Sequence, residues 1–180
     1  MTKIFFLFIL FSIPMAKEHT VVNFQKKTTL NDWYIVNDGV MGGLSQSEVH
    51  INGDGHLHFQ GKVSLENNGG FASVQHPMNL SGVHDFTHIT LRIKGDGRKY
   101  QFRLKSDRSQ AHSYIHSFET SGEWETIVLP IADFYAGFRG RKLDMATFNF
   151  DKIAQITFLI ADKKSGQFEL AVDWIKLTTK

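Results

Sequence analysis

The sequence predicts an all-β protein folded as a two-sheet β-sandwich. Apolar and polar residues alternate with a period of two over several short segments, as they do in strands with one buried face. The 16 Phe, 3 Trp and 4 Tyr suit the pleated surface of strands, which favours aromatic and β-branched side chains. No long segment shows the period of an amphipathic helix. About ten short strands with regular turn spacing indicate two packed sheets.

The predicted strands follow one another along the chain, and short turns separate several of them. Their ranges are 48–51, 56–60, 89–93, 100–104, 114–120, 124–129, 154–160 and 168–174. Gly-containing turns of the hairpin type are expected at 52–55, 95–97 and 121–123. Segment 154–160 is almost continuously apolar, which predicts a strand at the centre of a sheet.

One region breaks this regular pattern. Segment 132–150 contains four Phe residues without clear alternation, and we expect it to form a long packed loop. Segments 131–135 and 145–152 are expected to hold short helical turns at most.

The length of 180 residues indicates one domain, which we expect to span residues 17–180. Residues 1–16 resemble a signal peptide, with Lys3, an apolar run over 4–11 and cleavage near Ala16. An uncleaved amphiphilic anchor is the alternative. The apolar run is too short for a membrane-spanning helix, which needs about 20 residues, so no transmembrane segment is expected after cleavage. The sequence therefore predicts an exported bacterial protein, periplasmic or secreted.

Composition excludes several classes of function. The chain has no cysteine, which excludes disulfides, thiolate metal sites and a cysteine nucleophile. Twenty basic and 18 acidic residues give a net charge of +2 without a concentrated basic stripe, so no nucleic-acid partner is expected. The chain lacks a P-loop, a nucleophile elbow and a zinc-protease motif. Gly95-Asp96-Gly97 precedes a strand rather than a helix, so it does not predict a dinucleotide site, and we expect no cofactor.

Histidines offer only a weak case for a metal site. His56 and His58 alternate on one predicted strand and share a face, so their imidazoles could meet at one ion. Since no third ligand is visible, an exposed polar strand face is the better interpretation, and no metal is expected.

The most informative segment is the Gly-rich loop over 37–45. It combines Asp38 with three glycines and with the apolar residues Val40, Met41 and Leu44, which we expect to be buried. Glycine permits unusual backbone angles and close backbone approach, so an ordered loop of this composition is expected to form a tight corner or the rim of a binding site.

Charged residues in such loops allow more than one interpretation. Asp38 and Asp96 could act as an acid and a base, as in glycosidases, or accept hydrogen bonds from turn N–H groups, which is the more common role of Asp beside Gly. Arg139 lies between Phe138 and Gly140, so it could stack, pair with a carboxylate or remain solvated.

An ordered set of motifs resembles the complex I intermediate-associated protein 30 family over residues 24–177. The motifs occupy 37–45, 59–64, 67–73, 94–100 and 138–141, together with Trp124, Leu129-Pro130 and Phe134. The resemblance implies a galactose-binding-like jelly-roll sandwich with a non-catalytic role. It also implies similarity to mitochondrial assembly chaperones of respiratory complex I, although the Sec-type start of this chain predicts export instead.

The family motifs also supply candidate binding residues on loops at one end of the sandwich. They are Asp38, Met41, Gly42, Gly43, Ser45, Gly69, Gly70, Phe71, Asp96, Arg98, Tyr100, Arg139 and Gly140. Among them, the four charged side chains are expected to converge within reach of salt bridges.

Three functions remain open at this point. The first is a non-catalytic, assembly-chaperone-like module that engages an unidentified protein partner. The second is an exported carbohydrate-binding module, which would use exposed aromatic side chains to hold a glycan; the candidates are Trp33, Tyr34, Tyr135 and Phe138. The third is an enzyme that uses Asp38 or Asp96 as an acid or a base.

Overall fold

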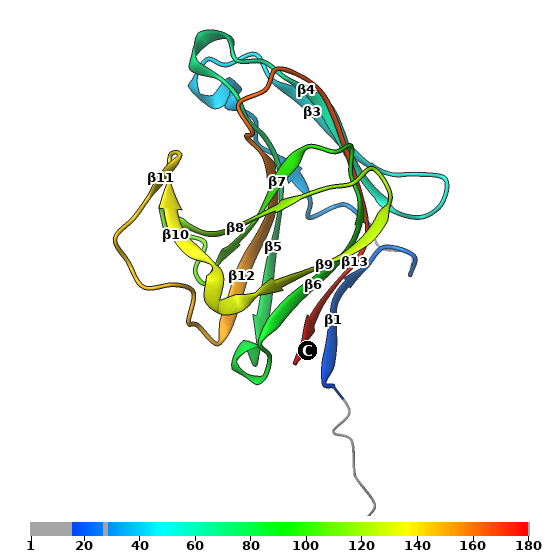
Figure 1. Cartoon of the computed structure of the whole chain (residues 1–180), viewed down its shortest axis with the longest axis vertical. Coiled ribbons are helices and arrows are strands. Elements are labelled where there is room, and N and C mark those ends of the chain that lie inside the picture. Colours follow the sequence, from blue (N-terminus) through cyan, green and yellow to red (C-terminus); the bar gives the residue numbers. More distant parts are fainter. Residues whose placement is uncertain (1–15, 27–28, 180) are drawn as a thin grey trace, which may run out of the picture.

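Two antiparallel β-sheets pack face to face in the computed structural model, which describes residues 16–26 and 29–179 (Figure 1). This arrangement confirms the predicted all-β sandwich. The expected signal segment, apart from Ala16, lies outside the described residues, so that expectation stays a prediction. Within the described part, no helix is long and apolar enough to cross a bilayer.

The first sheet has six strands. Its path runs β3 (Gln46–Ile51), β4 (Leu57–Val63), β13 (Gly166–Thr178), β6 (His88–Lys94) and β9 (Trp124–Pro130), and β1 (Glu18–Asn23) also pairs with β13. The long strand β13 pairs with β4 through its first half, and with β6 along its second half. It therefore ties the two halves of this sheet together.

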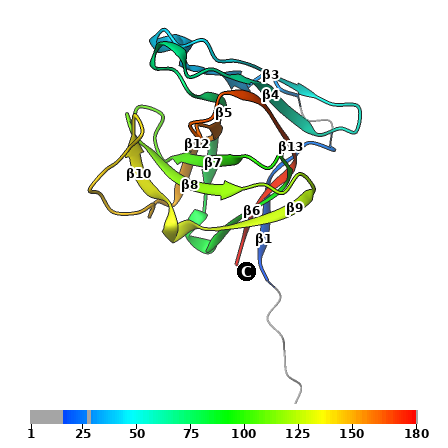
Figure 2. The ribbon, with the colours of Figure 1, turned by 45° about the horizontal axis from the view of Figure 1, so that its top comes forward.

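The second sheet has seven strands. Its order is β11 (Arg141–Lys142), β10 (Tyr135–Phe138), β8 (Ser113–Glu119), β7 (Lys99–Lys105), β12 (Lys152–Ile160), β5 (Ala72–Ser81) and β2 (Tyr34–Ile35). Short 3-10 helices lie in the connections: η1 (Asp38–Met41), η2 (Glu66–Asn68), η3 (Val83–Asp85) and η4 (Ile131–Asp133). Figures 1 and 2 show η1 and η2 together at one end of the sandwich.

A continuous apolar core fills the space between the sheets. It follows from the period-two pattern, because alternate residues of β7 and β12 point inward and are fully buried. The Phe102 and Phe158 rings on these neighbouring strands lie 5.0 Å apart, and Phe59 meets Phe168 in the other sheet at 4.9 Å. Such aromatic pairs contribute both buried area and a preferred ring geometry.

Strand β12 is the central strand that the apolar segment 154–160 predicts. It pairs with β5 on one side and β7 on the other. Its outward-facing residues Gln155, Thr157 and Leu159 are also buried, at only 5–6% exposure. Both faces of the strand are therefore covered, which explains why its sequence lacks clear alternation.

The structure differs from the sequence prediction in the Phe-rich region. Tyr135–Phe138 and Arg141–Lys142 form the hairpin β10–β11 rather than a loop. These strands are too short for a recognisable alternation, and their pairing with β8 is what defines them. The helical turn expected at 131–135 appears as η4, whereas 145–151 has no helix. Phe134 and Phe148 are buried, as expected for packed residues.

Replacing Phe158 by Ala should destabilise the fold by about 3–5 kcal/mol, because the change removes a fully buried ring and leaves a cavity beside Phe102. Chemical denaturation of both proteins measures the difference. The control is Val128→Ala on β9, where the side chain is half exposed and the cost should stay within about 1 kcal/mol. Equal losses for the two variants would contradict this description of the core.

Candidate binding surface

The buried carboxylate of Asp38 joins two loops. Its Oδ1 accepts a hydrogen bond from the Ser45 N–H (2.9 Å), and its Oδ2 accepts one from Ser45 Oγ (2.5 Å). From the second loop, the N–H groups of Gly70 (2.6 Å) and Phe71 (3.1 Å) also donate to Oδ2. The side chain is fully buried and makes no ion pair within the described residues. Asp38 is thus held by uncharged donors only.

Two of the candidate glycines make room for this carboxylate. A Cβ on Gly43 would lie 2.4 Å from the Asp38 Cγ, and a Cβ on Gly69 would lie 2.7 Å from its Oδ2. Any larger residue at either position would displace the carboxylate. This requirement for close approach accounts for glycine in both loops.

The surroundings of Asp38 keep it ionised. Burial by itself would raise the pKa of Asp38, but the hydrogen bonds from Ser45 Oγ and the N–H groups of Gly70, Ser45 and Phe71 outweigh it. The net result is a pKa below the usual value for aspartate. A carboxylate that stays charged without a cation nearby is suited to organising a backbone rather than to exchanging protons.

Further contacts complete the connection between the loops. Ser45 Oγ accepts from the Ser64 N–H (2.9 Å), and Asn67 Nδ2 donates to the Gly42 carbonyl (3.3 Å). The two segments lie side by side at one end of the sandwich (Figures 1 and 2). Ser64 and Asn67 belong to the candidate site although they were not among the predicted binding residues.

Four aliphatic side chains are exposed on these joined loops. The exposed fractions are 72% for Val40, 57% for Met41, 51% for Leu44 and 46% for Leu65. We call these four residues the apolar tip. The expectation that Val40, Met41 and Leu44 are buried is therefore wrong, because Asp38 points into the protein and turns the rest of the loop outward. Leu65 was missed, since a single Leu after a strand carries no signal in the sequence.

A second cluster forms around Asp96 and Tyr100. Asp96 accepts hydrogen bonds from Tyr100 Oη (3.0 Å) and from the backbone N–H groups of Arg98 (3.1 Å) and Glu169 (3.0 Å). Burial, followed by the charge of Asp96, raises the pKa of the Tyr100 hydroxyl far above its usual value. These contacts fix the β6–β7 turn against β13.

Arg98 belongs to the same cluster but faces Asp162. Its guanidinium binds both carboxylate oxygens of Asp162 (2.9 and 2.6 Å). It also donates to the backbone carbonyls of Lys164, Gly166 and Gln167. The hydrogen bond with Asp162 raises the pKa of Arg98 despite its burial. The guanidinium therefore holds the loop before β13 and the first residues of that strand.

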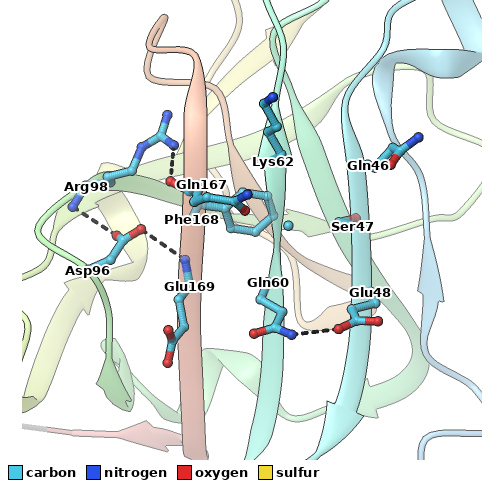
Figure 3. A pocket seen from close by; sticks show the side chains of 11 residues that line it. Gln46, Ser47, Glu48, Gln60, Lys62, Asp96, Arg98, Gln167, Phe168 and Glu169 are labelled. Atoms are coloured by element: carbon cyan, nitrogen blue, oxygen red, sulfur yellow. Dashed lines mark hydrogen bonds between the residues drawn. The ribbon is translucent and has the colours of Figure 1, made fainter.

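An open groove of about 770 Å³ lies beside this cluster, across β3, β4 and β13 (Figure 3). Asp96 and Arg98 border it, and polar side chains such as Gln60, Lys62 and Glu169 cover its floor. The polar atoms of Asp96 and Arg98 are already used within the fold. The groove thus offers space but few unengaged polar groups from the predicted site.

The last two candidate residues lie at the turn of the β10–β11 hairpin. Both Arg139 and Gly140 have positive φ angles, and the Arg139 guanidinium lies 5.2 Å from the Phe138 ring centroid. Among the described residues, Arg139 forms no ion pair with Asp38 or Asp96. The expected convergence of four charged side chains is therefore wrong. The Arg98 guanidinium pairs with Asp162, Asp96 hydrogen-bonds to Arg98 only through the Arg98 backbone N–H, and Asp38 and Arg139 make their contacts elsewhere.

His58 on β4 and His56, which directly precedes that strand, are engaged with neighbouring side chains. His58 Nε2 lies 2.8 Å from a Glu169 carboxylate oxygen, and the His56 ring packs against Trp124 at 4.5 Å. In the described part of the chain, no group of three His, Asp or Glu side chains is arranged to hold a metal ion.

The family comparison covers all of these loops. A family model described as complex I intermediate-associated protein 30 (CIA30) matches residues 22–172, which include all thirteen candidate residues. The chain belongs to the CIA30 family. The matched range covers both the Asp38 loops and the β10–β11 hairpin.

Curated CIA30 relatives correct the expected location. The mitochondrial protein of Mus musculus is 23% identical over 190 residues, covering 93% of this chain and 58% of that protein. A probable mitochondrial CIA30 of Caenorhabditis elegans is 30% identical over 103 residues, covering 53% and 30% respectively. The chain thus spans little more than half of the mouse relative. Because these relatives are named as mitochondrial, the expectation of an exported bacterial protein is wrong.

Solved structures confirm the jelly-roll sandwich. The family 11 carbohydrate-binding module of Clostridium thermocellum, in complex with a mixed-linked tetrasaccharide, has a TM-score of 0.65 at 20% identity. The match covers 89% of this chain and 94% of that one. A family 29 carbohydrate-binding module has a TM-score of 0.50 at 10% identity, covering 92% and 90%. At these identities the similarity establishes the fold alone.

Replacing Asp38 by Asn should destabilise the protein by about 2–3 kcal/mol at pH 7, because the amide brings an N–H₂ group toward buried donors. The lowered pKa means that the stabilisation is present above the unfolded-state pKa, near 3.8, and is lost as the pH falls through the folded-state value. The difference between the two proteins should therefore shrink in acid. Denaturation curves from pH 7 to about pH 3 measure it.

The matched control is Asp54→Asn in the exposed β3–β4 turn, which should change stability by less than about 0.5 kcal/mol. A cost for Asp38→Asn that is equally small, or that does not vary with pH, would contradict the role assigned to this carboxylate.

Proposed function

We propose that this chain is a non-catalytic module that engages a protein partner through the apolar tip. The observation that carries the proposal is the exposure of Val40, Met41, Leu44 and Leu65 on two loops fixed by Asp38. Clustered exposed apolar side chains commonly mark interaction surfaces. Because the loops are already ordered, binding costs less conformational entropy than it would with flexible loops.

Membership of the CIA30 family indicates which partner to test. The relatives are named for association with an intermediate of complex I. We propose the corresponding partner here, a membrane-bound assembly intermediate of respiratory complex I. The non-catalytic role is supported by the two candidate acids, because Asp38 and Asp96 accept hydrogen bonds that hold loops in place.

A carbohydrate-binding function has less support, although the fold allows it. Trp33 is buried and stacks on His76 with ring centroids 4.6 Å apart. Lys142 lies over the Tyr135 ring and Arg139 over the Phe138 ring. Of the four aromatic residues that could hold a glycan, Tyr34 is the most exposed, at 38%, while Trp33 is buried and the other two are half-buried. A single ring offers little of the stacking surface that a glycan chain needs.

The double variant Met41→Ser and Leu44→Ser should reduce partner binding by about tenfold or more, because it removes two apolar contacts at the centre of the tip. The tagged chain is incubated with detergent-solubilised inner membranes, and recovered complex I subunits are quantified by mass spectrometry. The fold should be retained, since both side chains are exposed.

The control is Val128→Ser, which changes an exposed apolar residue on β9, an edge strand of the six-stranded sheet. It should leave the recovery of complex I subunits unchanged. Equal recovery with the tip variant and the wild type would refute the proposed surface. The wild type and the tip variant are also mixed with protein-free lipid vesicles. If the wild type binds the vesicles, the variant does not, and no complex I subunits are recovered, the tip is a membrane contact instead.

A further inference from the structure

The outer face of the seven-stranded sheet carries a continuous row of polar and aromatic side chains. Directly paired residues of neighbouring strands share a face. The register places Tyr34 opposite Gln75, Gln75 opposite Thr157, and Thr157 opposite Arg103. Arg103 is followed by Ile115 and then Tyr135. This row crosses β2, β5, β12, β7, β8 and β10, on the face of the sheet opposite the apolar core.

On one half of this face the polar groups satisfy one another. Tyr34 Oη donates to Gln155 Oε1 (3.2 Å), and Gln155 Nε2 donates to Gln75 Oε1 (2.9 Å). Gln75 Nε2 reaches Ser73 Oγ at 3.4 Å, and Ser73 Oγ donates to the Val36 carbonyl. This half is a closed hydrogen-bond network that needs no ligand.

Arg103, in the middle of the row, is different. It is half-buried, and its Nε and Nη2 donate to the neutral Gln101 amide oxygen (2.9 and 2.6 Å). Among the described residues no carboxylate lies within ion-pair distance of it, and its Nη1 has no hydrogen-bond partner. Burial lowers the pKa of Arg103 to about 10, which still leaves it charged at neutral pH. A partly desolvated guanidinium without an anion is costly unless one binds.

Further cations lie on the same face of the sheet. Lys105 follows on β7, and burial lowers its pKa as well. Lys142 on β11 pairs with Gly137 and lies 5.4 Å from the ring centroid of Tyr135, which belongs to the row of Arg103. Arg141 instead pairs with Phe138, on the opposite face. None of the three cations Arg103, Lys105 and Lys142 forms an ion pair in the described structure.

We propose that this basic face, made of Arg103, Lys105 and Lys142, binds an acidic segment of a protein partner, with one carboxylate on Arg103. A guanidinium offers paired donors that match a carboxylate, and the two lysines supply charge complementarity. The inference rests on the proposed function, because it adds the chemistry of the partner to a module that binds protein. It concerns a surface separate from the apolar tip.

The position of Arg103 favours a protein segment over other anionic partners. A flat membrane surface would reach the exposed hairpin cations but not a half-buried side chain on the face of the sheet. An acidic glycan would need aromatic stacking surface, and Lys142 already covers the Tyr135 ring. A flexible Glu or Asp side chain is long enough to reach a half-buried guanidinium.

A fluorescent hexaglutamate peptide tests the proposal. Fluorescence anisotropy should detect binding at about 50 mM salt that weakens at about 200 mM, because salt screens the pairing of charges. Arg103→Gln should weaken binding about tenfold. The matched control is Arg92→Gln, which removes another arginine without a carboxylate partner, one that lies over Trp124 in the other sheet. The control should bind like the wild type.

A second variant keeps the test decisive if Arg103→Gln does not fold. Lys142→Gln changes an exposed residue of the same face and should weaken peptide binding about threefold. In addition, titration of the peptide should shift the NMR signal of the Arg103 Nε–H group. Equal binding by the variants and the wild type, or no shift at Arg103, would overturn the proposal.

Two further probes separate the other anionic partners. Oligogalacturonate and vesicles of phosphatidylcholine with cardiolipin are titrated in parallel. Tighter binding of either than of the glutamate peptide would overturn the assignment to a protein segment. The tip variant Met41→Ser and Leu44→Ser should bind the peptide normally. If the tip variant also recovers complex I subunits normally, the proposed function of the tip fails while the basic face stands. If the tip variant loses complex I subunits as expected but the glutamate peptide does not bind through Arg103, the basic face fails while the proposed function stands.

Discussion

The buried carboxylate of Asp38 is the contact on which the candidate binding surface depends. It gathers three backbone N–H groups and one hydroxyl from two loops that are far apart in sequence. Glycines at 43 and 69 let both backbones approach it. Since the polar end of the η1 loop is turned inward, its aliphatic side chains are turned outward. One inward-pointing charge thus explains both the order of the loops and the exposure of the apolar tip.

The fold was largely predictable because strand pairing leaves a simple trace in sequence. Strands with one buried face, such as β6 and β7, alternate clearly, and the continuous apolar run of β12 marks a central position. The hairpin β10–β11 and the short strand β2 were not predictable, because segments of two to four residues are too short to show a period. Their structure comes from the neighbouring strands with which they pair. The longer strands β1 and β5 were also missed.

The candidate site was predictable only in part. The Gly-rich loop with one Asp correctly marked an ordered segment, and Asp96, Arg98 and Tyr100 do lie together. Partners were beyond prediction: Arg98 pairs with Asp162, which is 64 residues away. The exposure of Val40 and Met41 was missed for a related reason, since apolar character alone cannot tell a core residue from a binding residue. Arg103 was missed too, because on β7 it looks like any polar residue of an alternating strand.

Amide hydrogen exchange tests the central role of Asp38 most directly. The account predicts that the N–H groups of Ser45, Gly70 and Phe71 exchange slowly, although they lie in loops, because each donates to the buried carboxylate. In Asp38→Asn all three should lose protection together, while the amides of β12 stay protected. Fast exchange of these three groups in the wild-type protein, or unchanged protection in the variant, would contradict the account.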